Sequence, residues 1–399
     1  MKKIGFVIPW YADDIPGGAE MLLRGMAKNL TERGIALEVL TTCVKEFGAD
    51  WNENYYKPGK DTSKFGFDII RFPVRKRDTA AFDYINLLLI DGHKINDDQQ
   101  ETFMEEMVNS PKLYEYIKEH KDEYSYFVYT PYMFGPTYYG SMACPEKAVL
   151  IPCFHDEAYF HMEIFCDMYS KVKGLVYNAR PEYELANKYY DLENMNQIVL
   201  GTGLDTKIEG RAERFIKKFK ITDPFIIYAG RKDVGKNVDT LIKYFGEYLL
   251  RKEKAGKKSD LKLVLIGGGK IDIPEENKDS IIDLGFVSIE EKYDAMAAAK
   301  FLCQPSKNES FSFVIMESWL CGRPVLVHED CKVTQDFALQ TNGGLWFKDY
   351  YDFEACTDFY LENEDKCKIM ADTGCAYVKE NFDWDVICTR FMDFLEKLD

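Results

Sequence analysis

Residues 308–328 read NESFSFVIMESWLCGRPVLVH, and their pattern predicts a turn, a helix and a short strand in succession. The apolar run 313–316 starts the helix just after the turn. Gly322 and Pro324 end that helix before a strand that closes at His328.

The two glutamates of this stretch, Glu309 on the turn and Glu317 in the helix, are eight residues apart. Free amides at a helix start suit a phosphate, so we expect Glu309 to lie beside that phosphate and its sugar. Glu317, further along the helix, could accept hydrogen bonds from vicinal hydroxyls such as those of a ribose. The alternative is a plain surface helix, because two glutamates at one spacing are a weak pattern.

Strands and helices alternate through the first half of the chain. A strand Lys3–Pro9, a helix Ala19–Arg33 and a strand Ile35–Thr41 predict a βαβ unit. The alternation continues, with strands expected at Ile69–Phe72, Tyr126–Tyr129, Ala148–Cys153, Gly174–Tyr177 and Gln197–Leu200 and a helix near Pro181–Tyr190. The first half is therefore predicted to be doubly wound.

A second series of the same kind starts after residue 205. The expected elements are strands Pro224–Ala229, Lys262–Ile266, Ile281–Leu284 and Phe301–Gln304 and helices Glu209–Phe219, Asp239–Arg251 and Ile289–Ala299. The polar stretch Lys252–Ser259 is expected to be a solvated loop, and the final segment Trp384–Leu398 an amphipathic helix that needs an apolar face to rest on. Two open sheets whose strand ends face one another would form a deep cleft.

Size and charge limit the class of protein. The chain has 399 residues, 46% of them hydrophobic and 15% aromatic, which suffices for two globular domains with buried cores. The formal net charge of −16 argues against a nucleic-acid partner, which needs a basic face. No run of about 18 apolar residues could span a bilayer, and the start lacks the length of a signal-peptide core. Eleven cysteines without a CxxC motif predict buried thiols in a reducing cytoplasm.

Positive charge is locally concentrated in Arg71–Arg77, which reads RFPVRKR. We expect a solvated loop there. The alternative is a small basic patch that touches an anionic lipid or a phosphate-bearing acceptor.

Two cations, Arg231 and Lys236, lie in residues 228–239, which run from a predicted strand end into a helix start at the mouth of the expected cleft. Arginine offers a fork to phosphate oxygens and lysine a point charge. Together they could neutralise a departing diphosphate without a metal. An exposed basic turn is the alternative.

Two glycine pairs mark places where the backbone can approach a ligand closely. Gly267 and Gly268 end a strand of the second series, where they would admit a flat base or a phosphate. Gly17 and Gly18 lie between the first strand and the first helix. A glycine cluster alone is weak evidence, and a tight turn is the alternative for Gly17 and Gly18.

His155 is the best placed of five histidines, because it lies just beyond the strand 148–153. A structural histidine is one alternative, and a metal cluster with the acidic and histidine residues of 156–163 is another. That spacing is not the helical HExxH pattern, so we expect no metal. The sole DxD motif, residues 383–385, is expected to cap a helix.

Tyrosines are concentrated in residues 124–139, where they supply apolar faces and hydroxyl groups. Core packing accounts for most of them. Tyr132, Tyr138 and Tyr139 follow the strand end and are candidates for stacking on an acceptor sugar.

Taken together, these motifs resemble the GT-B glycosyltransferases, and within them the large family 4 of retaining enzymes. Glu309 and Glu317 match the Glu-x7-Glu signature, and the cations, the glycine turns and His155 extend the resemblance over nearly the whole chain. It implies an α/β fold with two Rossmann-like domains facing each other across a cleft. The first domain would cover residues 1–204 and the returning helix 384–399, and the second residues 205–383.

The resemblance implies a role for each matching residue. Arg231 and Lys236 would hold the donor diphosphate, Glu309 the hydroxyls of the transferred sugar and Glu317 the ribose. The other donor-side residues would be Gly18, Gly267, Gly268, Phe311, Ser312, Phe313 and Val314, with amides of the last two capping the phosphates. The acceptor side would comprise Gly17, Gly18, Tyr132, Tyr138 and His155.

Ser312 departs from the family, which usually has glycine at that position. A serine side chain there either shifts the sugar pocket or points aside.

The activity that the resemblance implies is transfer of a sugar from a nucleotide diphosphate sugar to a glycan or lipid-linked acceptor, with retention and without metal or cofactor. Negative charge grows on the leaving phosphate, which would also accept the acceptor's proton while His155 polarises a sugar hydroxyl. An epimerase or hydrolase of nucleotide sugars and a non-catalytic nucleotide-sugar sensor are the alternatives. We expect a cytoplasmic protein, with weak contact to the inner face of the membrane left open.

Overall fold

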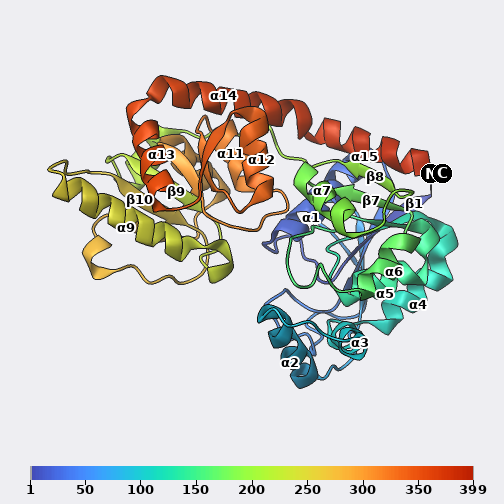
Figure 1. Cartoon of the computed structure of the whole chain (residues 1–399). Helices are drawn as coiled ribbons and strands as arrows, with labels where there is room; N and C mark the ends of the chain where they lie inside the picture. The colour runs from blue at the N-terminus through green and yellow to red at the C-terminus, as the bar shows by residue number, and fades with distance from the viewer. Residues whose placement is uncertain (1, 399) are drawn as a thin grey trace. The chain divides into compact units, whose positions relative to one another are not determined.

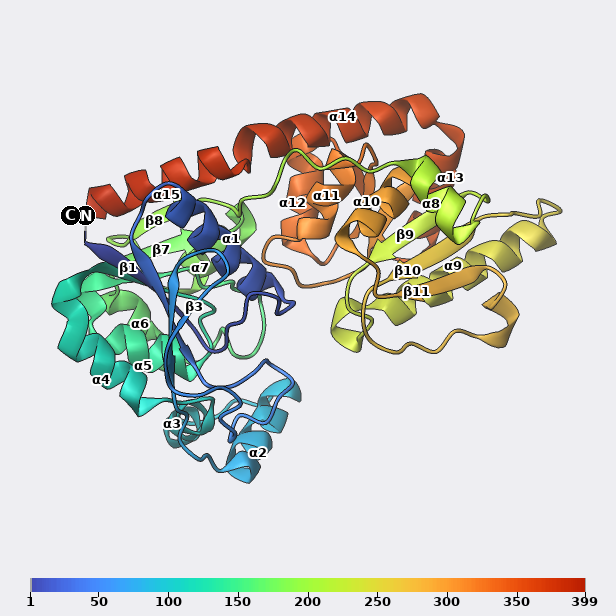
Figure 2. The same ribbon diagram turned by 180° about the vertical axis from the view of Figure 1, so that it is seen from behind.

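A computed structural model describes residues 2–398 and confirms the α/β class. The chain divides into two compact units. The first runs to Gly203 and takes in the final helix from Trp384, and the second is Leu204–Asp383. Each unit is built on one sheet with helices packed against it (Figures 1 and 2). The boundary after Gly203 lies one residue before the expected boundary after residue 204.

The sheet of the first unit has eight strands in the order β3-β4-β2-β1-β5-β6-β7-β8. Neighbouring strands pair in parallel, except that the exposed edge strand β3 is antiparallel to β4. The strands are β1 Lys3–Ile8, β2 Leu37–Thr42, β3 Gly59–Thr62, β4 Asp68–Phe72, β5 Tyr124–Tyr129, β6 Ala148–Leu150, β7 Gly174–Tyr177 and β8 Asn196–Val199. The inner strands are almost wholly buried, which a parallel sheet covered on both faces requires.

The helices of the first unit cover both faces of this sheet (Figure 2). Helices α4, α5 and α6 pack together on one face, and α15 contacts α1 on the other. The bounds are α1 Gly18–Glu32, α2 Thr79–Ile90, α3 Asp97–Glu106, α4 Pro111–His120, α5 Gly135–Ala143, α6 Ile164–Lys171, α7 Arg180–Tyr189 and α15 Trp384–Leu398, with short 3-10 turns η1 Lys121–Glu123 and η2 Pro145–Lys147.

The final helix, α15, rests on the first unit as its amphipathic pattern predicts. Phe391 stacks on Phe6 of β1 with ring centroids 6.4 Å apart. The ring of Trp384, at the start of the helix, covers Gly25 of α1 so closely that a Cβ on that glycine would lie 2.3 Å from it. A glycine in α1 therefore makes room for the returning helix.

The sheet of the second unit has six strands, all parallel, in the order β11-β10-β9-β12-β13-β14. The strands are β9 Phe225–Ala229, β10 Lys262–Ile266, β11 Ile281–Gly285, β12 Phe301–Gln304, β13 Val325–His328 and β14 Gly344–Phe347. The helices are α8 Ala212–Phe219, α9 Val238–Lys254, α10 Ile289–Ala298, α11 Phe313–Leu320, α12 Lys332–Thr341, α13 Tyr350–Glu362 and α14 Glu364–Asn381, with 3-10 turns η3 Val234–Lys236 and η4 Glu275–Asn277. Within residues 2–398, no helix is both long enough and apolar enough to cross a bilayer.

Several expected boundaries were wrong, and two of them have a clear local cause. Helix α9 continues through Lys254, past the predicted start of a solvated loop at Lys252. Its polar last turn is held because Lys252 donates to Asp358 of α13. Strand β6 ends at Leu150 rather than at Cys153, whose φ of 59° is incompatible with a strand.

The basic run 71–77 begins in strand β4 and continues as a loop from residue 73. Arg71 belongs to β4 and is buried, with its guanidinium donating to the carbonyl of Tyr11. Arg77 lies over the ring of Trp51, 4.9 Å from its centroid. Lys76 pairs with Glu53 at 2.8 Å. The expected solvated loop was therefore wrong at the buried Arg71, whereas the Lys76 side chain is 74% exposed. Each of these three cations already has a partner within the unit.

We predict that Gly25→Ala lowers the urea midpoint of unfolding. Alanine normally stabilises a helix interior by about 1 kcal/mol over glycine. Here the added methyl group would collide with the Trp384 ring, and overpacking of this kind costs about 1–3 kcal/mol. Gly18→Ala is the control in the same helix, since a Cβ there meets nothing within 4 Å. A Gly25→Ala midpoint at or above that of the wild type would contradict the packing of α15.

Candidate functional site

Loops at one edge of the second sheet gather the candidate residues of that unit. Because all its strands are parallel, their carboxyl ends lie at the same edge. Strand β9 leads to Arg231 and Lys236, β10 leads to Gly267, and β12 leads to Glu309 and then to α11. The fold therefore brings together residues that are far apart in the sequence.

Lys236 and Glu309 form an ion pair. Nζ of Lys236 lies 2.7 Å from Oε1 of Glu309, and the two side chains are 24% and 12% exposed. Gln304, at the end of β12, donates from Nε2 to the same oxygen at 3.2 Å. The carboxylate of Asp233 accepts from the amide of Lys236 and so caps the short helix that carries this lysine. The lysine expected to hold a diphosphate and the glutamate expected to hold a sugar are therefore in contact.

Arg231 and Lys232 are adjacent but have opposite environments. The side chain of Arg231 is 70% exposed, with Nε 3.6 Å from Asp233, so its guanidinium can turn towards an anion. Lys232 is buried, and its Nζ donates at 2.6 Å both to Asp283 and to the carbonyl of Gly267. Sequence reasoning missed Lys232, because two neighbouring cations after a strand give no sign of which one turns inward.

Close packing requires glycine at both positions after β10, Gly267 and Gly268. Gly267 has a φ of 124°, and a Cβ on it would lie 2.0 Å from the carbonyl oxygen of Gly230. A Cβ on Gly268 would lie 2.5 Å from the ring of Phe286. That ring follows β11 and is 81% exposed, so it offers a flat apolar surface at the same sheet edge. Packing alone explains both glycines. Sequence reasoning missed Phe286, because no local pattern marks it.

Glu317 is buried in α11 and is already paired. Its two carboxylate oxygens accept from Nζ of Lys292 in α10 at 2.6 and 2.7 Å. One of them also accepts from the hydroxyl of Tyr293 at 3.3 Å. A carboxylate has about four acceptor positions, so about one is left for a ligand. Sequence reasoning missed Lys292 and Tyr293, which appeared only as residues of an amphipathic helix.

The start of α11 is open to a ligand at its backbone. Phe311 is buried against Phe337 and Phe382, which fixes the chain just before the helix. No side chain caps the helix, so the amides of its first residues, Phe313 and Val314, lack an intrahelical partner. Ser312 is the N-cap residue and has a left-handed backbone, with φ 72° and ψ 78°.

In the first unit, Gly17 and Gly18 open helix α1 as expected. Gly17 has a φ of 144°, and a Cβ on it would lie 2.0 Å from the carboxylate of Glu20, which in turn accepts from Trp10. The space beside Gly18 is open, since a Cβ there would meet nothing within 4 Å. Gly17 is therefore explained by local packing, whereas Gly18 leaves room for another group.

His155 lies in the loop after β6 with its side chain 29% exposed and Nδ1 3.6 Å from Glu157. His161 pairs separately with Asp156 at 2.7 Å. Among the residues that the structure describes, no three histidine, cysteine or carboxylate side chains are arranged to hold a metal ion. The imidazole of His155 is thus accessible from solvent, and the carboxylate of Glu157 lies beside it.

Glu182 holds this loop in place and was not expected from the sequence. It is fully buried and accepts from the amide of Phe154 at 2.7 Å and from that of Asn178 at 2.6 Å. Burial raises the pKa of Glu182 from its ordinary value of 4.5 to about 7, although the amide hydrogen bonds act in the opposite direction. The backbone of Phe154, next to His155, is therefore held in place by a buried carboxyl group.

The tyrosines divide into buried and half-buried groups. Tyr132 is 1% exposed and packs against Phe154 and Phe165, so its ring offers no face to an acceptor and that expectation was wrong. Its hydroxyl instead donates to Glu157, the carboxylate beside His155. Tyr138 and Tyr139 are half-buried in α5, where their rings meet edge to face.

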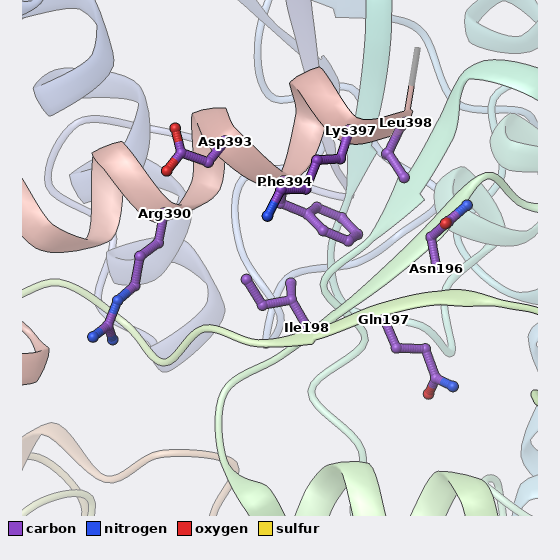
Figure 3. A pocket seen from close by; sticks show the side chains of 8 residues that line it. All are labelled: Asn196, Gln197, Ile198, Arg390, Asp393, Phe394, Lys397 and Leu398. Atoms are coloured by element: carbon purple, nitrogen blue, oxygen red, sulfur yellow. The ribbon is translucent and has the colours of Figure 1, made fainter.

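One cavity lies away from all these residues. It has a volume of about 370 Å³ and lies between the edge strand β8 and helix α15, with Gln197, Arg390 and Phe394 among its lining side chains (Figure 3). None of the residues predicted from the sequence lines it.

We predict that Lys292→Met lowers the free energy of unfolding by about 3–5 kcal/mol, because it leaves the buried Glu317 without its cation. The double variant Lys292→Met with Glu317→Leu should recover most of that loss, since an apolar pair no longer buries a charge. Urea unfolding of wild type, both single variants and the double variant measures this. A Lys292→Met cost below about 1 kcal/mol, as for an exposed pair, would contradict it.

A second prediction concerns pH. Because the pKa of Glu182 is raised on folding, its contribution to stability is full below pH 4.5 and is lost as the pH rises through about 7. The free energy of unfolding of the wild type, taken relative to Glu182→Gln, should therefore fall between pH 5 and pH 8, by at most about 3 kcal/mol. Urea unfolding of both proteins across this range tests it. A difference that does not change with pH would refute the raised pKa.

Comparison with known proteins finds similarity to one family over part of the chain. Residues 210–375 match the family model described as glycosyl transferases group 1. A Campylobacter jejuni protein, N-acetylgalactosamine-N,N'-diacetylbacillosaminyl-diphospho-undecaprenol 4-alpha-N-acetylgalactosaminyltransferase, is 28% identical over 166 residues. That match covers 40% of this chain and only 42% of the relative.

Solved structures match over the whole chain. Sucrose-phosphate synthase of Thermosynechococcus elongatus has a TM-score of 0.74 at 14% identity and covers 100% of this chain and 99% of its own. Anabaena HepE in complex with UDP-glucose has a TM-score of 0.71 at 14% identity, with full coverage of both chains. WaaG, a glycosyltransferase of lipopolysaccharide biosynthesis, has a TM-score of 0.63 at 15% identity and covers 98% and 99%. The chain therefore has the GT-B fold, and its residues 210–375 are similar to the glycosyl transferases group 1.

Proposed function

We propose that this protein transfers a sugar from a nucleoside diphosphate sugar to a glycan or lipid-linked acceptor, with retention of the anomeric configuration. The observation that carries the proposal is the contact between Lys236 and Glu309 beside the uncapped start of α11. It lies inside the segment that matches the family model. The similarity to HepE in complex with UDP-glucose and to a transferase acting on a diphospho-undecaprenol substrate supports this donor and acceptor class.

The donor would bind at the carboxyl edge of the second sheet. The amides at the start of α11 and the cations of Arg231 and Lys236 would surround the diphosphate. Glu309 would accept hydrogen bonds from the transferred sugar while it keeps Lys236 in position. Glu317, shared with Lys292, has capacity for about one ribose hydroxyl. The exposed ring of Phe286 would supply an apolar face for the base.

Transfer requires stabilisation of charge on the departing diphosphate. Two cations and two helix amides would provide positive charge where negative charge develops, which is the role a metal ion plays in other phosphate sites. The diphosphate oxygens would then accept the proton of the attacking hydroxyl on the face from which the leaving group departs. Attack on that face retains the anomeric configuration.

The first unit would bind the acceptor. Gly18 has open space beside it, and His155 is partly exposed with Glu157 next to it. Tyr132 supports Glu157 from the core, so it would act on the acceptor only through His155. We assign His155 the polarisation of a sugar hydroxyl.

A direct assay separates transfer from its two rivals. The purified protein is screened by thermal shift against UDP, GDP, dTDP and ADP, because a ligand that binds the folded state raises its melting temperature. Labelled sugars on the stabilising nucleotide are then incubated with and without free or lipid-linked acceptors. Donor loss only with acceptor supports transfer, whereas loss without acceptor supports a hydrolase or epimerase. Binding without turnover supports a sensor.

We predict that Arg231→Ala and Lys236→Ala each lower kcat/KM for transfer by about 100-fold or more, because each removes charge that the leaving diphosphate needs. Lys243→Ala is the matched control, since this α9 lysine is 74% exposed and pairs with Asp239 one turn away. The rates come from initial-velocity assays with the labelled donor. If both site variants kept near wild-type rates, the proposed leaving-group role would be wrong.

A further inference from the structure

Ser312 combines two unfavourable features in one position. Its φ of 72° lies in the left-handed region that favours glycine, although serine carries a side chain. The residue is also only 7% exposed. A chain that needed only the turn would be served better by glycine at this position.

The Ser312 hydroxyl does not perform the usual task of a serine before a helix. Such a serine accepts from an amide of the first helical turn and so caps the helix. Here the side chain makes no capping bond, and Oγ has no hydrogen-bond partner anywhere in residues 2–398. A buried hydroxyl without a partner costs free energy, so its presence calls for a physical reason.

A second unpartnered oxygen lies eight residues earlier. Oε1 of Gln304 is buried and, within the described part of the chain, has no partner, while Nε2 of the same side chain donates to Glu309. Glu309 in turn contacts Lys236. Buried polar groups with spare hydrogen-bonding capacity therefore lie on both sides of Glu309 in the sequence, at the edge where the donor is proposed to bind.

We infer that the hydroxyl of Ser312 donates a hydrogen bond to the β-phosphate of a nucleoside diphosphate held at the start of α11, and so helps to select a diphosphate over a monophosphate. This inference rests on the proposed function. The left-handed backbone keeps the side chain from capping the helix, so the hydroxyl and the uncapped amides of Phe313 and Val314 remain for the same anion.

The variants Ser312→Ala and Ser312→Gly separate the hydroxyl from the backbone. Both remove the hydroxyl, but only glycine relieves the left-handed conformation. Isothermal titration with UDP, GDP, dTDP and ADP first finds the diphosphate that the wild type binds most tightly, and the corresponding monophosphate serves as the second ligand. We expect both variants to bind that diphosphate about tenfold more weakly, which corresponds to about 1.4 kcal/mol. Their affinity for the monophosphate should stay unchanged.

Ser310→Ala is the control, because this serine is on the same turn and should leave both affinities as they are. Unchanged diphosphate affinity in both Ser312 variants would overturn the inference. So would weaker binding in the alanine variant alone, since that result would assign the effect to the backbone. If Lys236→Ala loses binding while the Ser312 variants do not, the proposed function stands without this contact. A wild type that binds none of the four diphosphates would overturn both.

Discussion

The ion pair of Lys236 and Glu309 is the contact on which the candidate site depends. The two residues leave adjacent strands, β9 and β12, and their side-chain atoms lie 2.7 Å apart in a mostly buried setting. Removing either partner would leave a charge with little water around it. The pair therefore fixes the loop after β9 against the turn before α11, and the open amides of that helix gain a cation beside them.

Buried ionisable side chains hold several loops of this chain in place. Lys232 ties the glycine loop after β10 to Asp283, and Lys292 neutralises Glu317 inside the second unit. In the first unit, Glu182 holds the backbone beside His155. Each of these groups is paired or hydrogen-bonded, which a buried charge requires. The loops at the strand ends thus owe their shape to specific polar contacts, whereas the strands beneath them depend on apolar burial.

The sequence was sufficient for the fold class and for most strands, because buried parallel strands leave apolar runs between turn residues. It was not sufficient where a tertiary contact overrides local polarity. Arg71 was expected in a solvated loop, but it belongs to strand β4 and its side chain is buried. Lys252 was expected to start a loop, but it continues helix α9 because Asp358 of α13 pairs with it. Glu309 and Lys236 were candidates from their motifs, and the structure brings their side chains into contact. Lys292 and Phe286 could not be foreseen, because nothing local distinguishes a helix lysine that meets a buried glutamate or a phenylalanine left exposed.

We propose that the second unit binds a nucleoside diphosphate through the loop 230–237 and the turn and helix start 308–317. Hydrogen exchange of the full chain, with and without UDP, GDP, dTDP or ADP, locates that contact without relying on any variant. We predict slower exchange in both segments with at least one of these nucleotides, and unchanged exchange in α13. Slower exchange confined to the first unit, or no change in either segment with any of the four, would contradict it.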